Sequence, residues 1–435
     1  MISLAALNAL PVSDFVATLG AIFEHSPWVA ERAAAARPFT SRLHLLDAMR
    51  AVVQRAHADE QLGLIRAHPQ LGARGRNRAQ LTEASSREQR RAGLDACTDD
   101  EFAQLMRLNA AYVGKFSFPF ILAVRGHGPE SILASLGSRL ENDAELERHT
   151  ALTQIGLIGG YRLADAVSSP AGAEIAAMRE RLVAAGSQGA AVGDRRPANV
   201  VREASESGID AVTTGRTTSA GNQIAALLRE WMLAAGLEVY DSGASAAAGV
   251  SAAGGASAAG GLSASGSAAW GSDGMIGAQQ GDQPGGRQRE QGAGESPRGR
   301  ERLLVGAYRD RTTGALRRDG TLGSLIGIEV AQQVRQRHLA SRFDLLVFAA
   351  PGDEGEQRGS VLTAAESHSS LNCAALTAAD IESLAPLRSA AVSERGMAIV
   401  SEGPARMTGQ VAQSPDVRTL ERAAQRLEAI LTAQI

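Results

Sequence analysis

Apolar side chains recur at helical spacing through the first 167 residues of the chain. Residues three and four apart share one face of a helix, so this spacing predicts a series of amphipathic helices. Ser13 and Ser41 precede two of the apolar stripes and are typical first caps of a helix. The predicted inward faces are Phe15, Leu19, Ile22 and Phe23; Leu43, Leu46, Met49, Val53 and Ala56; Phe102, Leu105, Leu108 and Tyr112; and Ile132, Leu133, Leu136 and Leu140.

Boundary signals support the same helices. A helix over about 60–67 must stop before Pro69, because proline disfavours helical backbone at the residue before it. Ser85 with Glu88 and Thr98 with Glu101 fit capping boxes. A last helix is expected over about 143–166. No strand alternation separates these pieces, so residues 1–167 are expected to form an all-α domain around one core.

The composition changes after this helical block. Residues 168–199 are rich in Ala, Gly and Ser and are predicted to be a linker with one helix. Residues 200–241 are patterned again. Residues 242–300 collapse into Gly, Ala, Ser and Gln. Such a segment buries too little apolar surface to offset its ordering entropy, so disorder is predicted there.

Residues 301–435 regain a pattern of apolar and polar positions. Short apolar runs at 302–307 and 343–349 have the length of strands, and 322–334 between them is helix-like. Strand, helix, strand at this spacing predicts a βαβ unit in a partial α/β region with a parallel sheet. The segment 420–430 is amphipathic, which suits either core packing or an interface helix.

Composition and charge narrow the classes of function. The 435 residues carry 44 Lys and Arg against 47 Asp and Glu, a net charge of -3, so no basic footprint for nucleic acid is present. No apolar run reaches the roughly 18 residues of a membrane-spanning helix, and the first residues lack a signal peptide's features. The two cysteines, Cys97 and Cys373, suit a reducing compartment. A cytoplasmic protein without nucleic-acid or membrane partners is expected.

Three places in the helical block concentrate residues suited to chemistry: His68-Pro69, the run 85–89, and the run 116–126. Each also has a structural explanation. A histidine at a helix end is favoured by the helix dipole, and Glu88 could simply cap its helix with Ser85. The aromatic run could be core, and Arg162 could be a solvated charge.

The order of these motifs resembles a known family. The ordered set resembles the OHCU (2-oxo-4-hydroxy-4-carboxy-5-ureidoimidazoline) decarboxylases of purine catabolism, over about residues 1–167. Ser117 departs from the family pattern, in which a glycine is usual. The segments that carry the likeness are Phe23-Glu24-His25-Ser26-Pro27-Trp28, His68-Pro69, Ser85-x-x-Glu88-Gln89, Leu108-Asn109-x-x-Tyr112, Lys115-Phe116-x-Phe118-Pro119-Phe120, Arg139-Leu140-x-Asn142 and Arg162-Leu163.

The resemblance implies an all-helical, homodimeric enzyme that decarboxylates a small purine catabolite to (S)-allantoin without a cofactor or metal. It implies that His68 is the catalytic acid, with Glu88 acting beside it. Whether Glu88 reaches substrate or only caps its helix stays open. The pocket residues that the resemblance implies are Pro69, Ser85, Ser86, Arg87, Glu88, Gln89, Phe120, Ile121, Leu122, Ala123 and Val124, with Arg162 as a further contact.

The chemistry can be derived without the resemblance. Loss of CO₂ leaves electron density that the neighbouring C=N bond of the ring can delocalise, so no metal is obligatory. A proton must then reach one face, which fixes the handedness of the product. Histidine titrates near neutral pH and can deliver that proton.

Residues 200–360 faintly resemble the binuclear-zinc amidohydrolases that include allantoate amidohydrolase and N-carbamoyl amino acid hydrolases. Tyr308 replaces the ligand histidine of the first motif, and Arg309 places a cation beside it. A catalytically inactive remnant is therefore predicted. Two alternatives remain: a bifunctional enzyme that also hydrolyses allantoate, and a non-catalytic helical interaction protein. The remaining candidate ligands are all carboxylates, which zinc disfavours as a complete set: Asp310, Asp319, Asp353 and Glu354.

Overall fold

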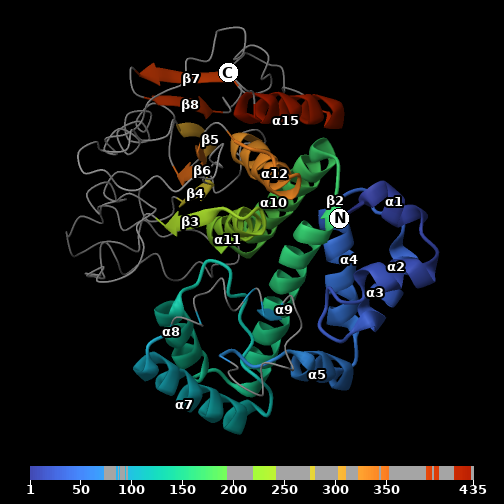
Figure 1. The fold of residues 1–435 in the computed structure, drawn as a ribbon, viewed down its shortest axis with the longest axis vertical. Helices are drawn as coiled ribbons and strands as arrows, with labels where there is room; N and C mark the ends of the chain where they lie inside the picture. The colour runs from blue at the N-terminus through green and yellow to red at the C-terminus, as the bar shows by residue number, and fades with distance from the viewer. Residues whose placement is uncertain are drawn as a thin grey trace, which may run out of the picture. The chain divides into compact units, whose positions relative to one another are not determined.

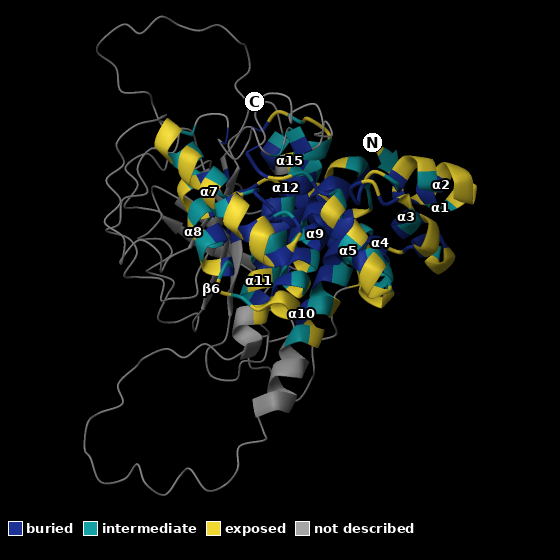
Figure 2. Cartoon of the chain, turned by 90° about the horizontal axis from the view of Figure 1, so that it is seen from below, coloured by how far each residue is buried: buried dark blue, intermediate teal, exposed yellow. Residues whose placement is uncertain are grey.

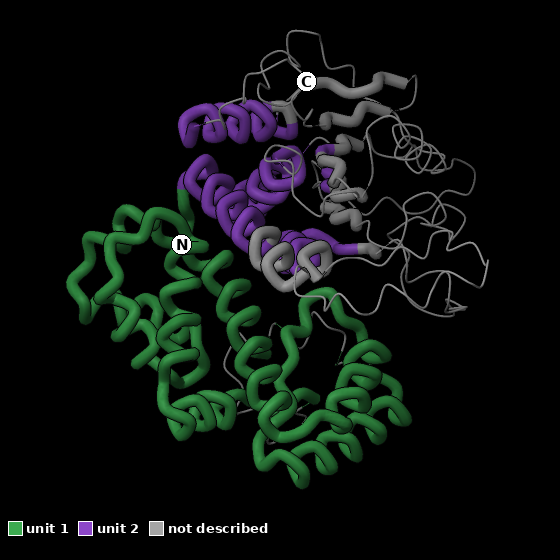
Figure 3. Tube along the Cα trace, turned by 180° about the vertical axis from the view of Figure 1, so that it is seen from behind, with its two compact units in different colours: residues 1–169 green, residues 170–435 purple. Residues whose placement is uncertain are grey.

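The computed structural model describes residues 1–72, 85–86, 88, 94, 97–193, 219–241, 275–279, 302–309, 322–341, 344–351, 388–393, 396–400 and 416–432. The chain divides into two compact units, Met1–Ser169 and Pro170–Ile435 (Figure 3). Each unit is described separately below.

The first unit is helical, as the apolar spacing predicts. Its helices are α1 (Leu4–Ala9), α2 (Val12–Leu19), α3 (Pro27–Ala33), the 3₁₀ turn η1 (Ala34–Ala36), α4 (Arg42–Arg55), α5 (Ala58–Ala67), α7 (Asp99–Phe116), α8 (Pro129–Arg139) and α9 (Ala144–Ala166) (Figure 1). Two short strands, β1 (Ile2–Ser3) and β2 (Val167–Ser168), pair in parallel and bring the two ends of the unit together.

The predicted caps explain where these helices begin. The Thr98 hydroxyl accepts from the Glu101 amide at 3.2 Å, and the Glu101 carboxylate accepts from the Thr98 amide at 2.8 Å. This capping box starts α7. Ser41 caps α4 by accepting from the His44 amide at 3.0 Å. The caps that sequence spacing places at Thr98 and Ser41 are therefore confirmed. The cap expected at Ser13 is wrong, because α2 begins at Val12 after Pro11, and Ser13 lies inside the helix.

The first predicted apolar stripe extends beyond the end of its helix. Helix α2 stops at Leu19, so Ile22 and Phe23 lie in a turn rather than on the helix. Both are still buried, at 6 % and 2 % exposure. Gly20 follows the last residue of α2, and the next helix begins at Pro27, whose fixed φ is favourable in the first turn.

The core of the first unit gathers around the C-terminal half of α9, whose residues are mostly buried (Figure 2). A Cβ on Gly159 would lie 3.1 Å from the ring of Phe23. The glycine therefore lets the turn after α2 approach α9 closely. This close contact places the 22–26 turn beside the last turns of α9, which carry Arg162.

The second unit contains one six-stranded sheet and four helices among the described residues. The helices are α10 (Ala171–Gly193), α11 (Ser219–Ala234), α12 (Leu322–Gln336) and α15 (Val417–Thr432), and the strands are β3 (Glu238–Asp241), β4 (Met275–Gln279), β5 (Arg302–Arg309), β6 (Asp344–Pro351), β7 (Arg388–Ser393) and β8 (Gly396–Val400). The strand order is β3-β4-β6-β5-β8-β7.

The predicted βαβ unit is confirmed: β5 and β6 are parallel, and α12 connects them. Helix α12 packs on both strands, and a Cβ on Gly327 would lie 3.0 Å from Val347. The expected parallel sheet is present in part: β6, β5 and β8 are parallel neighbours, whereas β4 pairs antiparallel with both β3 and β6, and β7 with β8. Antiparallel edges of this kind are common on otherwise parallel sheets.

The structure corrects one of the expected segments. Strand β4 lies inside residues 242–300, for which disorder is predicted, because ladder bonds to β3 and β6 order a stretch that its own composition does not. Within residues 168–199 the one predicted helix is present as α10, which buries Ile175, Met178 and Leu182 in its own unit. Residues 194–218, 242–274 and 280–301 lie outside the described part of the chain.

The packing of α15 decides between core packing and an interface role for the amphipathic segment at 420–430. Leu420, Ala423 and Leu427 are at most 1 % exposed, and α15 packs against α10 and α12. Core packing therefore accounts for its apolar face. Among the described helices, none combines the length and the apolar character that a bilayer crossing requires.

Candidate functional site

His68 lies at the C-terminal end of α5. Its backbone is extended, with φ -76° and ψ 137°, and its amide donates to the Ile65 carbonyl at 3.2 Å. Pro69 follows directly, which prevents the helix from continuing. The imidazole therefore leaves the helix axis and folds back, with Nδ1 3.0 Å from the Leu64 carbonyl oxygen.

That contact fixes the tautomer of His68. A carbonyl oxygen can only accept, so Nδ1 must carry the hydrogen and Nε2 is left with its lone pair in the neutral ring. Nε2 is buried and has no hydrogen-bond partner among the residues that the structure describes. Burial lowers the pKa of His68 from 6.5 to about 4, although the Leu64 hydrogen bond and the Glu24 charge oppose this shift. At neutral pH the ring is therefore uncharged and presents a proton acceptor.

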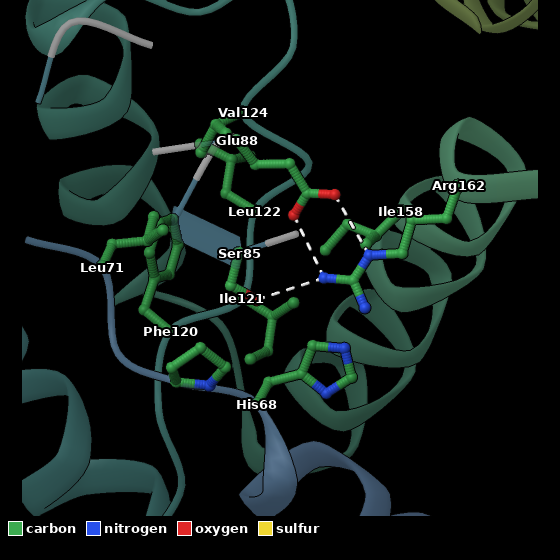
Figure 4. A pocket seen from close by; sticks show the side chains of 11 residues that line it. His68, Leu71, Ser85, Glu88, Phe120, Ile121, Leu122, Val124, Ile158 and Arg162 are labelled. Atoms are coloured by element: carbon green, nitrogen blue, oxygen red, sulfur yellow. Dashed lines mark hydrogen bonds and ion pairs between the residues drawn. The ribbon is translucent and has the colours of Figure 1, made fainter. Parts of the chain in front are cut away.

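His68 borders a small cavity of about 30 Å³ that is partly open to solvent. The apolar wall of the cavity comes from the segment after α7, together with Ile158 of α9. Ser85, Glu88 and Arg162 supply its polar groups, and Arg162 also lies on α9 (Figure 4). The residues that line the cavity are His68, Pro69, Leu71, Ser85, Glu88, Phe120, Ile121, Leu122, Val124, Ile158 and Arg162.

Most of the residues expected at the site therefore meet around one cavity. Ala123 does not line it, although its amide donates to Gln154 at 2.9 Å and helps to fix the wall. Ser86 is half-buried and is also not a lining residue. Arg87 and Gln89 lie outside the described residues. What each lining residue does stays a prediction.

Arg162 is the polar centre of the cavity. Only 8 % of its side chain is exposed, so the expectation of a solvated charge is wrong. Its Nε and Nη2 each lie 3.1 Å from one oxygen of Glu88, and Nη2 donates to the Ser85 hydroxyl at 3.1 Å (Figure 4). The Nη1 atom donates to Glu24 at 2.6 Å. Burial alone would lower the pKa of Arg162, but Glu88 and Glu24 outweigh it and raise that pKa, so the guanidinium stays charged.

Glu88 faces the cavity rather than solvent alone. Both of its carboxylate oxygens accept from Arg162, and 24 % of the side chain is exposed. A paired but partly accessible carboxylate can change partners when a ligand enters. The geometry therefore adds a third explanation, an ion pair with Arg162, to the two that the sequence left open.

Three residues of the site are not assigned to it from the sequence: Glu24, Ile158 and Leu71. Glu24, buried at 1 % exposure, is the partner of Arg162 from a turn 138 positions earlier, which no local spacing could reveal. Ile158 could have been found, because it precedes Arg162 by four residues and so shares its face of α9. Leu71 follows His68 closely and joins the apolar wall.

A second buried network holds the apolar wall in place. Arg139 on α8 donates from Nη1 to the Ile121 carbonyl at 2.6 Å and from Nε to Glu147 at 2.9 Å. Tyr112 also donates to Glu147, and burial raises the pKa of that phenol. Glu147 is fully buried, so its charge depends on these donors. The wall is thus tied to α7, α8 and α9 at once.

The side chains that line the cavity suit acid–base chemistry. Within the described part of the chain, no group of three or more His, Cys, Asp or Glu side chains is arranged to hold a metal ion. The cavity presents the neutral imidazole of His68, the charged guanidinium of Arg162, and an apolar wall. The carboxylate of Glu88, which pairs with Arg162, can change partners. This set suits binding an anion and moving one proton.

Comparison with known proteins agrees with this geometry. The family profile described as OHCU decarboxylase matches residues 8–164. A 2-oxo-4-hydroxy-4-carboxy-5-ureidoimidazoline decarboxylase of Haloferax volcanii is 40% identical over 168 residues, which is 39% of this chain and 98% of that protein. The uric acid degradation bifunctional protein PucL of Bacillus subtilis is 40% identical over 168 residues, 39% of this chain and 33% of that protein.

A crystal structure of (S)-allantoin synthase shares 30% identity, covers 39% of this chain and 55% of that chain, and has a TM-score of 0.32. The family profile match ends at residue 164, before the second unit, which begins at Pro170. An identity of 40% over 98% of the Haloferax volcanii enzyme shows that the two proteins are homologous. This chain belongs to the OHCU decarboxylase family.

Proposed function

We propose that this protein decarboxylates 2-oxo-4-hydroxy-4-carboxy-5-ureidoimidazoline to (S)-allantoin, with His68 as the group that moves the proton. The observation that carries the proposal is the buried Nε2 atom of His68, which faces the same cavity as Arg162 and Glu88. The matching relatives carry the name of this decarboxylase.

Binding is the first step. The substrate is a carboxylate, and Arg162 is the charged donor that lines the cavity near His68. A guanidinium edge suits a carboxylate because two parallel N–H groups match its two oxygens. Glu88, displaced from that edge, becomes free to accept hydrogen bonds from the ureido N–H groups of the substrate.

The bond to the carboxylate then breaks. CO₂ leaves, and the electrons of the broken C–C bond form a double bond to the neighbouring ring carbon while the C=N electron pair moves to the ring nitrogen. That nitrogen takes one proton from solvent at the open side of the cavity, which balances the charge. The apolar side chains of Phe120, Ile121 and Leu122 exclude water from their own side of the cavity and favour release of the neutral gas.

The enol must then become a ketone. Its hydroxyl loses a proton, and the neighbouring ring carbon, which bears the ureido group, gains one. Since the resting ring of His68 is neutral, Nε2 accepts the hydroxyl proton first and donates it to carbon afterwards. His68 thus acts as a donor only after it has acted as an acceptor. Delivery from one wall of the cavity gives one enantiomer.

The test measures both rate and handedness. The unstable substrate is generated in situ from urate, and circular dichroism follows the appearance of (S)-allantoin. His68→Ala is expected to lower turnover by roughly 10²-fold or more, since acid–base groups contribute 10² to 10⁴. His149→Ala, which removes an exposed histidine on α9, serves as the matched control and should change nothing. A His68→Ala enzyme of unchanged rate and enantiomeric excess refutes the assignment.

We propose further that the enzyme acts in the cytoplasm as a homodimer, with no nucleic acid or membrane as partner. The support is the family resemblance together with the near-neutral charge balance. Light scattering on the eluting full chain would show twice the monomer mass. A single monomer peak at working concentrations contradicts this assembly.

We propose that residues 200–360 are an inactive remnant of a binuclear-zinc amidohydrolase. The support is Tyr308, which stands where that family places a ligand histidine. The four remaining candidates, Asp310, Asp319, Asp353 and Glu354, lie outside the described residues. Zinc prefers histidine and thiolate to an all-carboxylate set. About two zinc ions per purified chain, with ammonia release from allantoate, would overturn this proposal.

A further inference from the structure

Glu24 is a buried carboxylate to which the proposed chemistry gives no task. It lies in the turn after α2, and 1 % of its side chain is exposed. Its Oε2 accepts from Arg162 at 2.6 Å and from the Ser85 hydroxyl at 3.3 Å. A buried carboxylate is tolerated only where such donors compensate for its lost hydration. It is absent from the cavity lining.

The two carboxylate partners of Arg162 differ in position. Glu24 contacts the Nη1 corner, where the Ile22 carbonyl also accepts at 3.4 Å. Glu88 contacts the opposite edge, formed by Nε and Nη2, and lines the cavity. The buried partner therefore lies behind the guanidinium, and the accessible partner lies in front of it.

The turn that carries Glu24 is itself fixed. The ring of Phe23 is 2 % exposed and packs against Gly159, one turn before Arg162 on α9. The Ser26 amide donates to the Phe23 carbonyl at 3.1 Å, which closes the turn. Glu24 is thus held to the same stretch of α9 that carries Arg162.

We propose that Glu24 is a positioning residue: it holds Arg162 by the Nη1 corner, so that the Nε–Nη2 edge faces the cavity and can exchange Glu88 for the carboxylate of the substrate. The inference rests on the proposed function for the identity of the incoming anion. The orientation of Arg162 does not depend on that identity.

Two substitutions of Glu24 separate the effect of its hydrogen bond to Arg162 from the effect of its charge. An amide oxygen can accept from Nη1 as a carboxylate does, and the Ser85 hydroxyl can accept as well as donate. Glu24→Gln therefore keeps the acceptor and the shape, whereas Glu24→Ala removes the anchor. With the anchor lost, the guanidinium is free to rotate toward Glu88 and its edge no longer points consistently into the cavity.

The experiment compares these two variants in the full-length protein, with Glu60→Ala as control. Glu60 pairs with Arg32 at the surface of the same unit, so its loss reports the effect of removing any ion pair. With substrate formed in situ, Glu24→Ala should raise KM about tenfold or more, as expected for one lost charge-assisted hydrogen bond. Glu24→Gln should restore KM to within about threefold of the parent value. Glu60→Ala should leave KM and kcat unchanged.

A second readout separates this inference from the proposed function. The Arg162 Nε–H group, hydrogen-bonded to Glu88, should give a slowly exchanging proton–nitrogen NMR signal in the parent protein and in Glu24→Gln. Glu24→Ala should broaden or shift it. If the parent protein shows no decarboxylation but this pattern holds, the proposed function fails and the positioning role stands. A folded Glu24→Ala with unchanged KM and an unchanged Arg162 signal, or a Gln variant as impaired as Ala, overturns the positioning role.

Discussion

At the scale of single residues, His68 shows how backbone geometry sets chemistry. Pro69 ends the helix, and the freed imidazole folds back to donate to the Leu64 carbonyl. The same burial that leaves Nε2 facing the cavity lowers the pKa of the ring to about 4. One local arrangement therefore determines the tautomer, the charge and the direction in which the proton first moves.

The lowered pKa makes stability depend on pH. Between pH 6.5 and about 4 the unfolded chain binds a proton at His68 that the folded chain does not. Linkage then requires the folded state to lose stability as pH falls through this window, and to keep it above 6.5. From pH 7 to pH 5 the loss attributable to His68 should be about 2 kcal/mol. Urea titrations at both pH values measure it.

His68→Gln supplies the comparison for this pH effect, because an amide does not titrate. The difference in unfolding free energy between parent and variant should shrink by the same amount as pH falls from 7 to 5. Parallel pH profiles for the two proteins would mean that the imidazole is not held neutral by burial.

How much of the site the sequence predicts depends on how local each contact is. His68 and Pro69 are adjacent, and Ser85 and Glu88 are separated by one helical turn, so their grouping is visible in the sequence. The pairing of Glu24 with Arg162 joins a turn to a distant helix and appears only when Phe23 packs on Gly159. Motif spacing carries no information about such a contact.

At the scale of elements, the apolar wall of the cavity is a stretch of chain that belongs to no helix or strand. Residues 118–124 form no helix or strand, and most are buried. Their position comes from side chains on neighbouring helices: Arg139 donates to the Ile121 carbonyl, and Gln154 accepts from the Ala123 amide. The shape of the wall is therefore set by tertiary contacts with α8 and α9.

Glu147 is the shared hydrogen-bond acceptor of Tyr112 and of Arg139, the residue that holds the Ile121 carbonyl. Glu147→Ala removes the acceptor of Tyr112 and the counter-charge of Arg139, both in the interior. Breaking a buried pair in this way should cost about 3–5 kcal/mol of unfolding free energy. Glu60→Ala is the surface control: it removes the ion pair with Arg32 and the capping bond from the His57 amide, and should cost about 1–2 kcal/mol. Urea denaturation of the three proteins gives both values, and equal losses would contradict a supporting role for Glu147.

Gly159 lets the ring of Phe23 pack closely against α9. A Cβ there would lie 3.1 and 3.2 Å from two atoms of the Phe23 ring, which is buried and cannot move aside freely. Gly159→Ala should therefore destabilise the protein by about 1–3 kcal/mol through overpacking. Gly137→Ala, where nothing lies within 4 Å of the added atom, should be neutral or stabilising by up to about 1 kcal/mol. Thermal unfolding of both variants decides: if Gly159→Ala is as stable as Gly137→Ala, the contact with Phe23 is loose.

The elements of the two units differ in how far sequence predicts them. Helices such as α7 and α9 carry their own periodicity and caps, so their existence follows from local pattern. Strand β4 has no such pattern, since its order comes from ladder bonds to β3 and β6 on both sides. The antiparallel pairing of β4 is for the same reason invisible in its five residues.

At the scale of the whole molecule, the residues of the candidate site all belong to the first unit. The cavity, the Arg162 cluster and the network around Glu147 fall within Met1–Ser169. The family match ends at residue 164, and a 168-residue alignment with this chain covers 98% of the Haloferax volcanii relative. The part of the chain that carries the chemistry thus coincides with one compact unit.

A chain truncated after Ser169 should therefore fold and decarboxylate at the rate of the full protein. The truncation keeps the β1–β2 pairing, which joins Ile2 to Val167 and ties the two ends of the unit. Circular dichroism at 222 nm and cooperative urea unfolding would establish that the truncated chain is folded, before kcat and KM are compared with those of the full chain. A truncated chain that unfolds cooperatively but produces racemic allantoin at the uncatalysed rate would show that residues 170–435 contribute to the site. Equal rates and equal enantiomeric excess would assign the decarboxylation to the first unit alone.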